Sequence, residues 1–182
     1  RGLGDVYKRQ WLNLIAGALL LGILAIPAAN LRLAMPTDGT AKLGSPQREA
    51  YEITAEKFGE GRNAPMIAYV DTANVAEQDR MSAYQTLLQD FSDTEGVVNA
   101  QIVQTTDNMD AAQILITPNS GATDEATTQT LERLRGFKQP FEDETDATFG
   151  ITGITPIFDD ISEMLSNVPV SYTHLTLPTK RI

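Results

Sequence analysis

The feature that most constrains this chain is an apolar run near its start, from Trp11 to Ala29 (WLNLIAGALLLGILAIPAA). Asn13 is the only strongly polar side chain in the run. As an α-helix the run would be roughly 28 Å long, close to the bilayer hydrocarbon thickness of about 30 Å. Trp11 suits a membrane interface, and Pro27 stands near the far end, where a helix tolerates proline best. The sequence therefore predicts a membrane-spanning helix over residues 11–29.

A secretory signal peptide is the alternative interpretation of the same run. The apolar region of a signal peptide usually has only about 7 to 15 residues, and a basic segment precedes it. In this chain the basic residues that precede the apolar run are Lys8 and Arg9, and they belong to a segment that looks foreign to the protein. The length of the run favours the spanning helix, and those two charges give no orientation in the membrane.

Both ends of the chain look like translated sequencing adapter. Residues 5–10 (DVYKRQ) and 170–175 (VSYTHL) can be encoded by DNA stretches that are reverse complements of each other. An inverted DNA repeat at two ends of a chain has no reason at the level of the protein, and such segments are set aside in fold reasoning. We therefore expect residues 1–10 and 170–182 to be artefacts that flank a biological segment of residues 11–169.

The charge balance is strongly acidic. The whole chain has 14 basic and 24 acidic residues, a net charge of −10, and setting the two ends aside changes this to 9 and 23, a net charge of −14. Such a charge argues against binding to nucleic acid or to an anionic lipid surface. The single histidine, His174, lies in an end segment, and the chain has no cysteine. We expect no nucleic-acid partner, no cofactor and no histidine- or cysteine-based metal or catalytic site.

The residues after the apolar run predict a connector and then a short helix. Residues 30–44 contain glycine and proline and few bulky apolar residues, which is typical of a connector. Ser45 is a candidate helix N-cap, and Pro46 occupies the first helical position. Apolar residues then recur at helical spacing before Gly59, at Tyr51, Ala55 and Phe58.

Strand and helix patterns then follow in the order βαββαβ. The strand-like runs are Met66–Val70, Val97–Thr105, Gln113–Thr117 and Ala147–Thr152, and the polar residues 106–110 predict a hairpin between the middle two. The first helix spans about Ala73–Asp93, with Met81, Tyr84, Leu87, Leu88 and Phe91 on one face; the second spans about Asp124–Phe137, with Leu131 and Leu134 inward. This order is typical of a ferredoxin-like α+β domain, in which two helices cover one face of an antiparallel-rich sheet.

The chain organisation that follows is a domain over residues 45–156 and a last amphipathic helix over 157–169. The apolar stripe of that helix comprises Ile157, Ile161, Met164, Leu165 and Val168. At helical spacing such a stripe is typical of a packing face.

No catalytic apparatus is visible. Asp159 and Asp160 are adjacent, and neighbours on a helix point about 100° apart, so we expect that they do not converge on one ion or substrate. The acidic residues Glu142, Asp143, Glu144 and Asp146 are expected to form a solvated loop. Gly59-Glu-Gly61 is interpreted as a turn, because it lacks the preceding strand and the spacing of a phosphate-binding loop.

The inventory of nucleophiles is equally sparse. Without histidine or cysteine, and with lysines only at positions 42, 57 and 138 of the biological segment, no activated nucleophile can be assembled. We therefore expect no enzymatic activity, no catalytic residue and no metal ligand, and the sequence assigns no substrate-binding residue.

Two groups of residues resemble markers of the MMPL transporters, which belong to the resistance-nodulation-division superfamily. The first group follows the apolar run and comprises Met35-Pro-Thr-Asp-Gly39, Ser45-Pro-Gln-Arg48, Ala50-Tyr51, Phe58-Gly-Glu-Gly61 and Ala64-Pro65. The second group comprises Thr152-Gly-Ile-Thr155, Asp160-Ile-Ser162 and Leu165. Ala64 stands where the family commonly has Gly, and Pro156 where it commonly has Ala; both departures concern the local backbone geometry.

The resemblance implies a proton-driven exporter of lipids or other hydrophobic molecules in the plasma membrane. The segment would contribute one transmembrane helix and one extracytoplasmic porter domain, of the second half of the transporter, with residues 30–169 mainly outside the cytoplasm. Its implied partners are the rest of its own chain, the lipid bilayer and a hydrophobic substrate. Residues 11–29 contain no Asp or Glu, so the proton relay is expected in other helices.

Two other classes of function stay open. One is a single-pass, membrane-anchored extracytoplasmic domain that binds a ligand or a partner. The other is an anchored hydrolase, which the inventory of nucleophiles disfavours.

Overall fold

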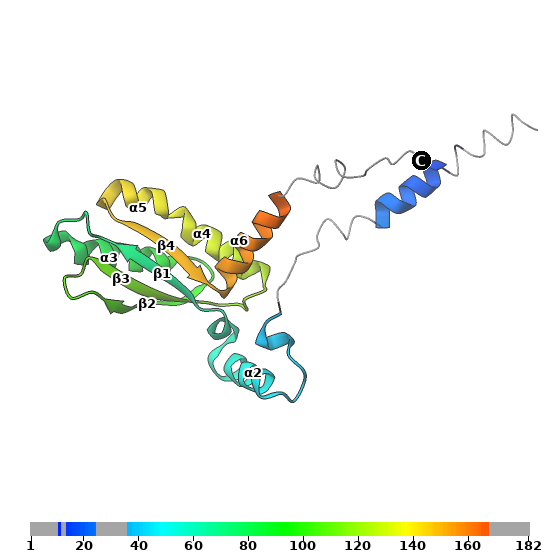
Figure 1. Cartoon of the computed structure of the whole chain (residues 1–182), viewed down its shortest axis with the longest axis horizontal. Coiled ribbons are helices and arrows are strands. Elements are labelled where there is room, and N and C mark those ends of the chain that lie inside the picture. The colour runs from blue at the N-terminus through cyan, green and yellow to red at the C-terminus, as the bar shows by residue number, and fades with distance from the viewer. Residues whose placement is uncertain (1–10, 12–13, 25–35, 168–182) are drawn as a thin grey trace, which may run out of the picture. The chain divides into compact units, whose positions relative to one another are not determined.

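The computed structural model describes residues 11, 14–24 and 36–167, and Figure 1 labels their helices and strands. The chain divides into two compact units between Leu33 and Ala34. In the first unit, residues 14–24 are helical, and their leucine and isoleucine side chains are exposed. Within the described residues, no helix has both the length and the hydropathy that crossing a membrane requires. The span predicted over 11–29 includes residues 12–13 and 25–29, which lie outside the described residues.

The second unit begins with helical turns that flank one helix. These are η1 (Asp38–Thr40), α2 (Pro46–Phe58) and η2 (Glu60–Asn63). The Oγ of Ser45 accepts a hydrogen bond from the Arg48 amide at 3.4 Å, which confirms the predicted N-cap. Gly59, with a φ of 93°, ends α2. None of the α2 side chains is buried, and α2 covers neither face of the sheet (Figure 1).

Four strands form one antiparallel sheet. They are β1 (Met66–Asp71), β2 (Val97–Thr105), β3 (Ala111–Pro118) and β4 (Thr148–Gly153). Their order across the sheet is β2-β3-β1-β4, and every neighbouring pair is antiparallel. The predicted α+β class is confirmed, and each predicted strand overlaps an observed one.

The helices that follow α2 in this unit are α3 (Glu77–Asp93), α4 (Glu125–Gly136), α5 (Lys138–Thr145) and α6 (Ile154–Asn167). They depart from the predictions at three places. α6 begins at Ile154, three residues before the helix predicted over 157–169. α3 begins four residues later than predicted, because Asp71 Oδ1 accepts from the Ala73 amide at 2.9 Å and the Val75 amide donates to the Thr72 carbonyl at 2.9 Å. These bonds hold residues 71–75 in a turn rather than in a helix.

α5 was not predicted, and the interpretation of residues 142–146 as a loop was wrong. Glu142, Asp143 and Glu144 lie on α5, and only Asp146, in the left-handed conformation, follows its end. The sequence pattern did not predict this helix because Pro140 looked like a helix breaker. Proline is tolerated in the first turn of a helix, where the amide has no intrahelical partner. The acidic residues themselves are half-buried or exposed, and Phe141 of α5 is buried.

One face of the sheet carries the hydrophobic core. β1 and β3 alternate, so that one set of side chains points toward the helices: Met66, Ala68, Val70, Ala112, Ile114 and Ile116. The helices contribute Tyr84, Leu87 and Phe91 of α3, Leu131 and Leu134 of α4 and Phe141 of α5. The inward orientation of Leu131 and Leu134 is thereby confirmed, whereas Met81, predicted on the inward face of α3, is 42% exposed.

Candidate functional site

The sheet face opposite the core is partly open. Ile67 and Tyr69 of β1 and Gln113 and Leu115 of β3 point to this side, because strand residues alternate between faces. They are half-buried, except that Tyr69 is 51% exposed. Tyr69 lies opposite Gly150 of β4, and a β-carbon on Gly150 would contact nothing within 4 Å. An accessible aromatic ring therefore lies beside the one β4 position opposite it, Gly150, which has no side chain.

A hollow of about 470 Å³ lies at one end of this face, where the β2–β3 hairpin turns. It is lined by Tyr69, Val70, Asp71, Ala73, Gln104, Thr105, Thr106, Asp110, Ala111, Ala112 and Gln113. Gln104 and Gln113 are cross-strand partners, as are Asp71 and Ala111. The hollow therefore combines an aromatic ring, two amides and two carboxylates, and no basic residue lines it.

The two carboxylates are held in fixed positions. Asp110 accepts hydrogen bonds from Thr106 Oγ1 at 2.6 Å and from Asn108 Nδ2 at 2.7 Å. These two bonds, with a smaller contribution from the charge of Arg80, lower the pKa of Asp110 below its usual value. Asp71 uses Oδ1 to accept from the Ala73 amide. Because the Thr72 amide donates to the Asp110 carbonyl at 2.8 Å, both aspartates lie at the same end of the sheet.

Buried hydroxyl groups form hydrogen bonds with the backbone of the hairpin turn. Thr72 Oγ1 and Tyr84 Oη are 2.7 Å apart, and both donate to the Met109 carbonyl, at 2.9 and 2.7 Å. Arg80 Nη1 donates to the Asn108 carbonyl at 2.8 Å. These bonds tie residues 108 and 109, which directly precede the lining residue Asp110, to α3.

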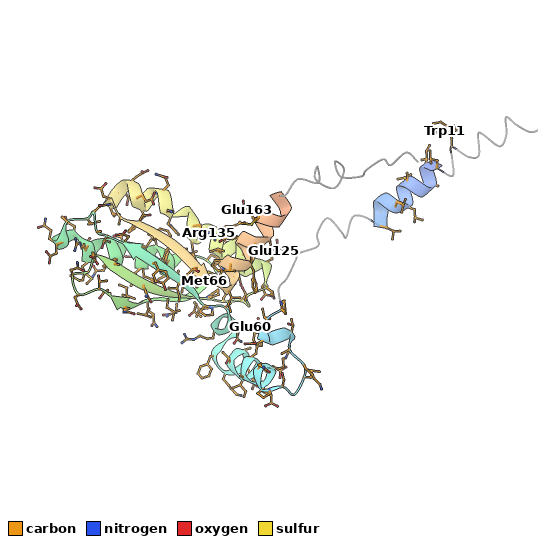
Figure 2. The ribbon with its side chains drawn as sticks, in the orientation of Figure 1. Trp11, Glu60, Met66, Glu125, Arg135 and Glu163 are labelled. Atoms are coloured by element: carbon orange, nitrogen blue, oxygen red, sulfur yellow. The ribbon has the colours of Figure 1, made fainter. Side chains whose placement is uncertain are left out.

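Asp159 and Asp160 both pair with one arginine side chain of α4. Arg135 of α4 donates from Nη1 to Asp159 Oδ2 at 3.0 Å and from Nη2 to Asp160 Oδ1 at 2.8 Å. The two nitrogens of a guanidinium can reach carboxylates that point apart, and the expectation that these aspartates form no site for a bound ion or substrate stays a prediction. Arg135 is labelled where α4 and α6 meet (Figure 2), and the pair of ion pairs joins these helices.

Two further features do not line the hollow. Gly59-Glu-Gly61 leads from α2 into η2, and Gly61 packs against the backbone of Pro118. Asp90 of α3 has a raised pKa, because of partial burial first and the neighbouring charges of Glu144 and Asp93 next. Within the described residues, no group of three or more His, Cys, Asp or Glu could hold a metal ion.

The sequence pattern assigns no binding residue, so the hollow was not predicted. Its lining comes from β1, the two strands of the hairpin and the turns that follow them. The one signal in the sequence that related to the hollow was the polar segment 106–110 between two strands. This segment predicts a hairpin turn, but it does not show that the turn lies close to Tyr69.

Two curated proteins are similar to nearly the whole chain. Membrane protein YdfJ of Bacillus subtilis is 26% identical over 166 residues, which is 91% of this chain and 22% of that protein. The mycolic acid-containing lipids exporter MmpL11 of Mycolicibacterium smegmatis is 23% identical over 169 residues, 91% of this chain and 18% of that protein. The chain thus spans about a fifth of the length of these relatives, and the similarities support a distant relationship to MMPL-type membrane proteins.

No protein-family model matches the chain. Among solved structures, it is similar to SnoaB, a cofactor-independent oxygenase from Streptomyces nogalater, with 11% identity and a TM-score of 0.36 over 50% of this chain and 91% of that one. A conserved protein from Methanosarcina mazei shows 12% identity and a TM-score of 0.35 over 52% and 96%. At these TM-scores the likeness supports no conclusion about fold or function.

Proposed function

We propose that the chain is a segment of a proton-driven MMPL-type exporter and contributes a porter domain that forms part of the wall of the substrate path. The similarity to YdfJ and MmpL11 over 91% of the chain carries this proposal. The substrate class, by the same analogy, is lipids or other hydrophobic small molecules. The segment belongs to the second half of the transporter, and the proton relay lies in transmembrane helices elsewhere in that protein.

The fold supports this function. The strand order β2-β3-β1-β4, with helices between β1 and β2 and between β3 and β4, fits the ferredoxin-like arrangement that we propose for residues 45–156. A sheet with one face buried by helices and the other partly open can present Ile67, Tyr69 and Leu115 to a passing apolar molecule. We assign that open face to the substrate path.

The proposed location is the plasma membrane, with residues 30–169 mainly outside the cytoplasm. The exposed leucines and isoleucines of residues 14–24 support insertion of the run 11–29 into a bilayer, since an isolated helix that is apolar all round is unfavourable in water. The stripe of α6 then leads toward a further transmembrane helix after residue 169. This domain has no catalytic role in the proposal.

Genomic sequence around the coding segment for residues 11–169 tests the proposal. The expected result is an open reading frame that continues past Pro169 directly into a long apolar helix, and that continues upstream of Trp11. A stop codon or a second soluble domain directly after Pro169 would overturn the exporter and favour an anchored binding domain.

A functional test uses the full-length parent gene in its own host. Deletion of codons 36–167 should cause a hydrophobic metabolite to accumulate inside the cell and to disappear from the envelope, as measured by comparative lipid extraction. The matched control is a point variant outside the open face, Asp143→Asn, which should export normally. An unchanged envelope composition in the deletion strain would contradict the assignment to transport.

A further inference from the structure

The hollow at the end of the β2–β3 hairpin has the dimensions of a ligand site. Its volume of about 470 Å³ lies within the range of about 300 to 1,000 Å³ that small-molecule sites occupy. Two of its lining residues, Asp71 and Asp110, are held by hydrogen bonds. A site held in this way loses little conformational entropy when a ligand binds.

The charge of the lining determines what can enter. Asp71 and Asp110 supply two carboxylates, and no lysine or arginine is among the lining residues. Arg80, the nearby cation, donates through Nε to the Val75 carbonyl and through Nη1 to the Asn108 carbonyl, and it lines no part of the hollow. An anionic ligand would therefore be repelled by the two carboxylates, although Arg80 partly offsets the charge of Asp110, whereas a cation would be attracted.

The aromatic ring and the amides further restrict the ligand. Tyr69 lines the hollow and is 51% exposed, so its ring can contact a cation there. Gln104 and Gln113 are neutral and can contact a polar or an apolar body. A bare divalent ion does not fit, because the site has only two carboxylates and one of them already accepts from Thr106 and Asn108.

We propose that this hollow binds a small organic cation with an apolar body, such as a quaternary ammonium group attached to an aromatic ring. The cation lies over the Tyr69 ring and beside the Asp71 carboxylate, and the apolar body lies along Ala111 and the aliphatic part of Gln113. The inference does not depend on the proposed transport function, since it concerns binding to this domain alone.

Titration of the purified full chain in a neutral detergent with benzyltrimethylammonium, followed by calorimetry and by the tyrosine signals in NMR, tests this site. Benzenesulfonate serves as the anionic probe and neopentylbenzene as the uncharged isostere. We expect saturable binding of the cation alone, with displacement of the Tyr69 ring signals. Equal or tighter binding of either of the other two probes would overturn the proposal.

Two variants locate the site. Asp71→Asn keeps an oxygen that can accept from the Ala73 amide and removes the charge, and Tyr69→Leu removes the ring. Each variant should weaken binding of the cation by about 3- to 10-fold, because an exposed ion pair or cation–π contact contributes only a modest binding free energy. The matched control Asp143→Asn removes one charge on α5, outside the lining, and should leave the affinity within about 2-fold, since screened long-range charges contribute little.

Circular dichroism of each variant verifies its fold before binding is compared. If Tyr69→Leu does not fold, Asp71→Asn decides the question. An Asp71→Asn variant that folds and binds the cation as tightly as the unmodified chain would overturn the assignment.

Discussion

Gly61 lies so close to Pro118 that a β-carbon on Gly61 would stand 1.6 Å from the Pro118 carbonyl oxygen. This approach joins η2, directly after α2, to the end of β3. Since α2 buries no side chain of its own, the contact at Gly61 is one of the places where residues 46–63 are attached to the sheet.

Gly61→Ala should therefore destabilise the domain. The new methyl group meets backbone rather than a movable side chain, and overpacking of this kind costs about 2 to 3 kcal/mol. Urea unfolding measures the change, and hydrogen exchange should show that protection is lost first in residues 46–63. Gly136→Ala is the matched control, because a β-carbon there meets nothing within 4 Å. Equal stabilities of the two variants would contradict the close approach.

Arg135→Gln should loosen the attachment of α6 to α4. The side chain is 34% exposed and pairs with Asp159 and Asp160, which are 24% and 61% exposed. Partly exposed pairs contribute modestly, so we expect a loss of about 1 kcal/mol that shrinks at high salt. Thermal unfolding at two ionic strengths measures it. The control Arg133→Gln removes an exposed 3.9 Å ion pair with Glu95 and an exposed 3.1 Å hydrogen bond to the Glu95 carbonyl, and it should change stability less.

Tyr84→Phe should cost about 1 to 2 kcal/mol of folding free energy. The variant removes a fully buried hydroxyl that bonds to the Met109 carbonyl and lies 2.7 Å from Thr72 Oγ1, and it leaves a buried acceptor with one donor fewer. Denaturant unfolding gives the difference. Tyr69→Phe, on an exposed ring with no bonded hydroxyl in the described contacts, should be nearly neutral. A neutral Tyr84→Phe would show that the network does not stabilise the hairpin turn.

Asp90→Asn should stabilise the domain at neutral pH and not at low pH. Burial and the charges of Glu144 and Asp93 raise the folded-state pKa of Asp90 above its ordinary value of 3.8. A raised pKa favours the folded state below the unfolded pKa, and that advantage is lost as the pH rises through the folded pKa. The ionised carboxylate is therefore unfavourable at pH 7, and asparagine relieves it.

Unfolding of Asp90→Asn and of the unmodified chain at pH 7 and near pH 3 measures this dependence. The gain should be present at pH 7 and should vanish at the lower pH, where Asp90 is protonated in both states. Asp143→Asn, which removes an exposed charge on α5, controls for the change in net charge. A gain that is the same at both pH values would contradict the assigned cause.

Much of the secondary structure was predictable because its signals are local. The Ser45 cap with Pro46 and the alternation of Met66, Ala68 and Val70 each depend on residues within a few positions of one another. Two of the helix errors arose where a local signal misled. Pro140 marked an apparent break inside a first turn, and the side chain of Asp71 held a turn that looked like the beginning of a helix.

The sequence by itself determined the acidic charge, the lack of histidine and cysteine outside the end segments, the apolar run 11–29 and the alternation that gives the sheet a buried face. Only the tertiary structure decided that Arg135 reaches two adjacent aspartates 24 and 25 residues away, that Gly61 contacts Pro118, and that Tyr69 shares a hollow with Asp110. The physical reason is that propensity and periodicity act between near neighbours along the chain. The distance between segments far apart in sequence is set by how the strands pair and the helices pack.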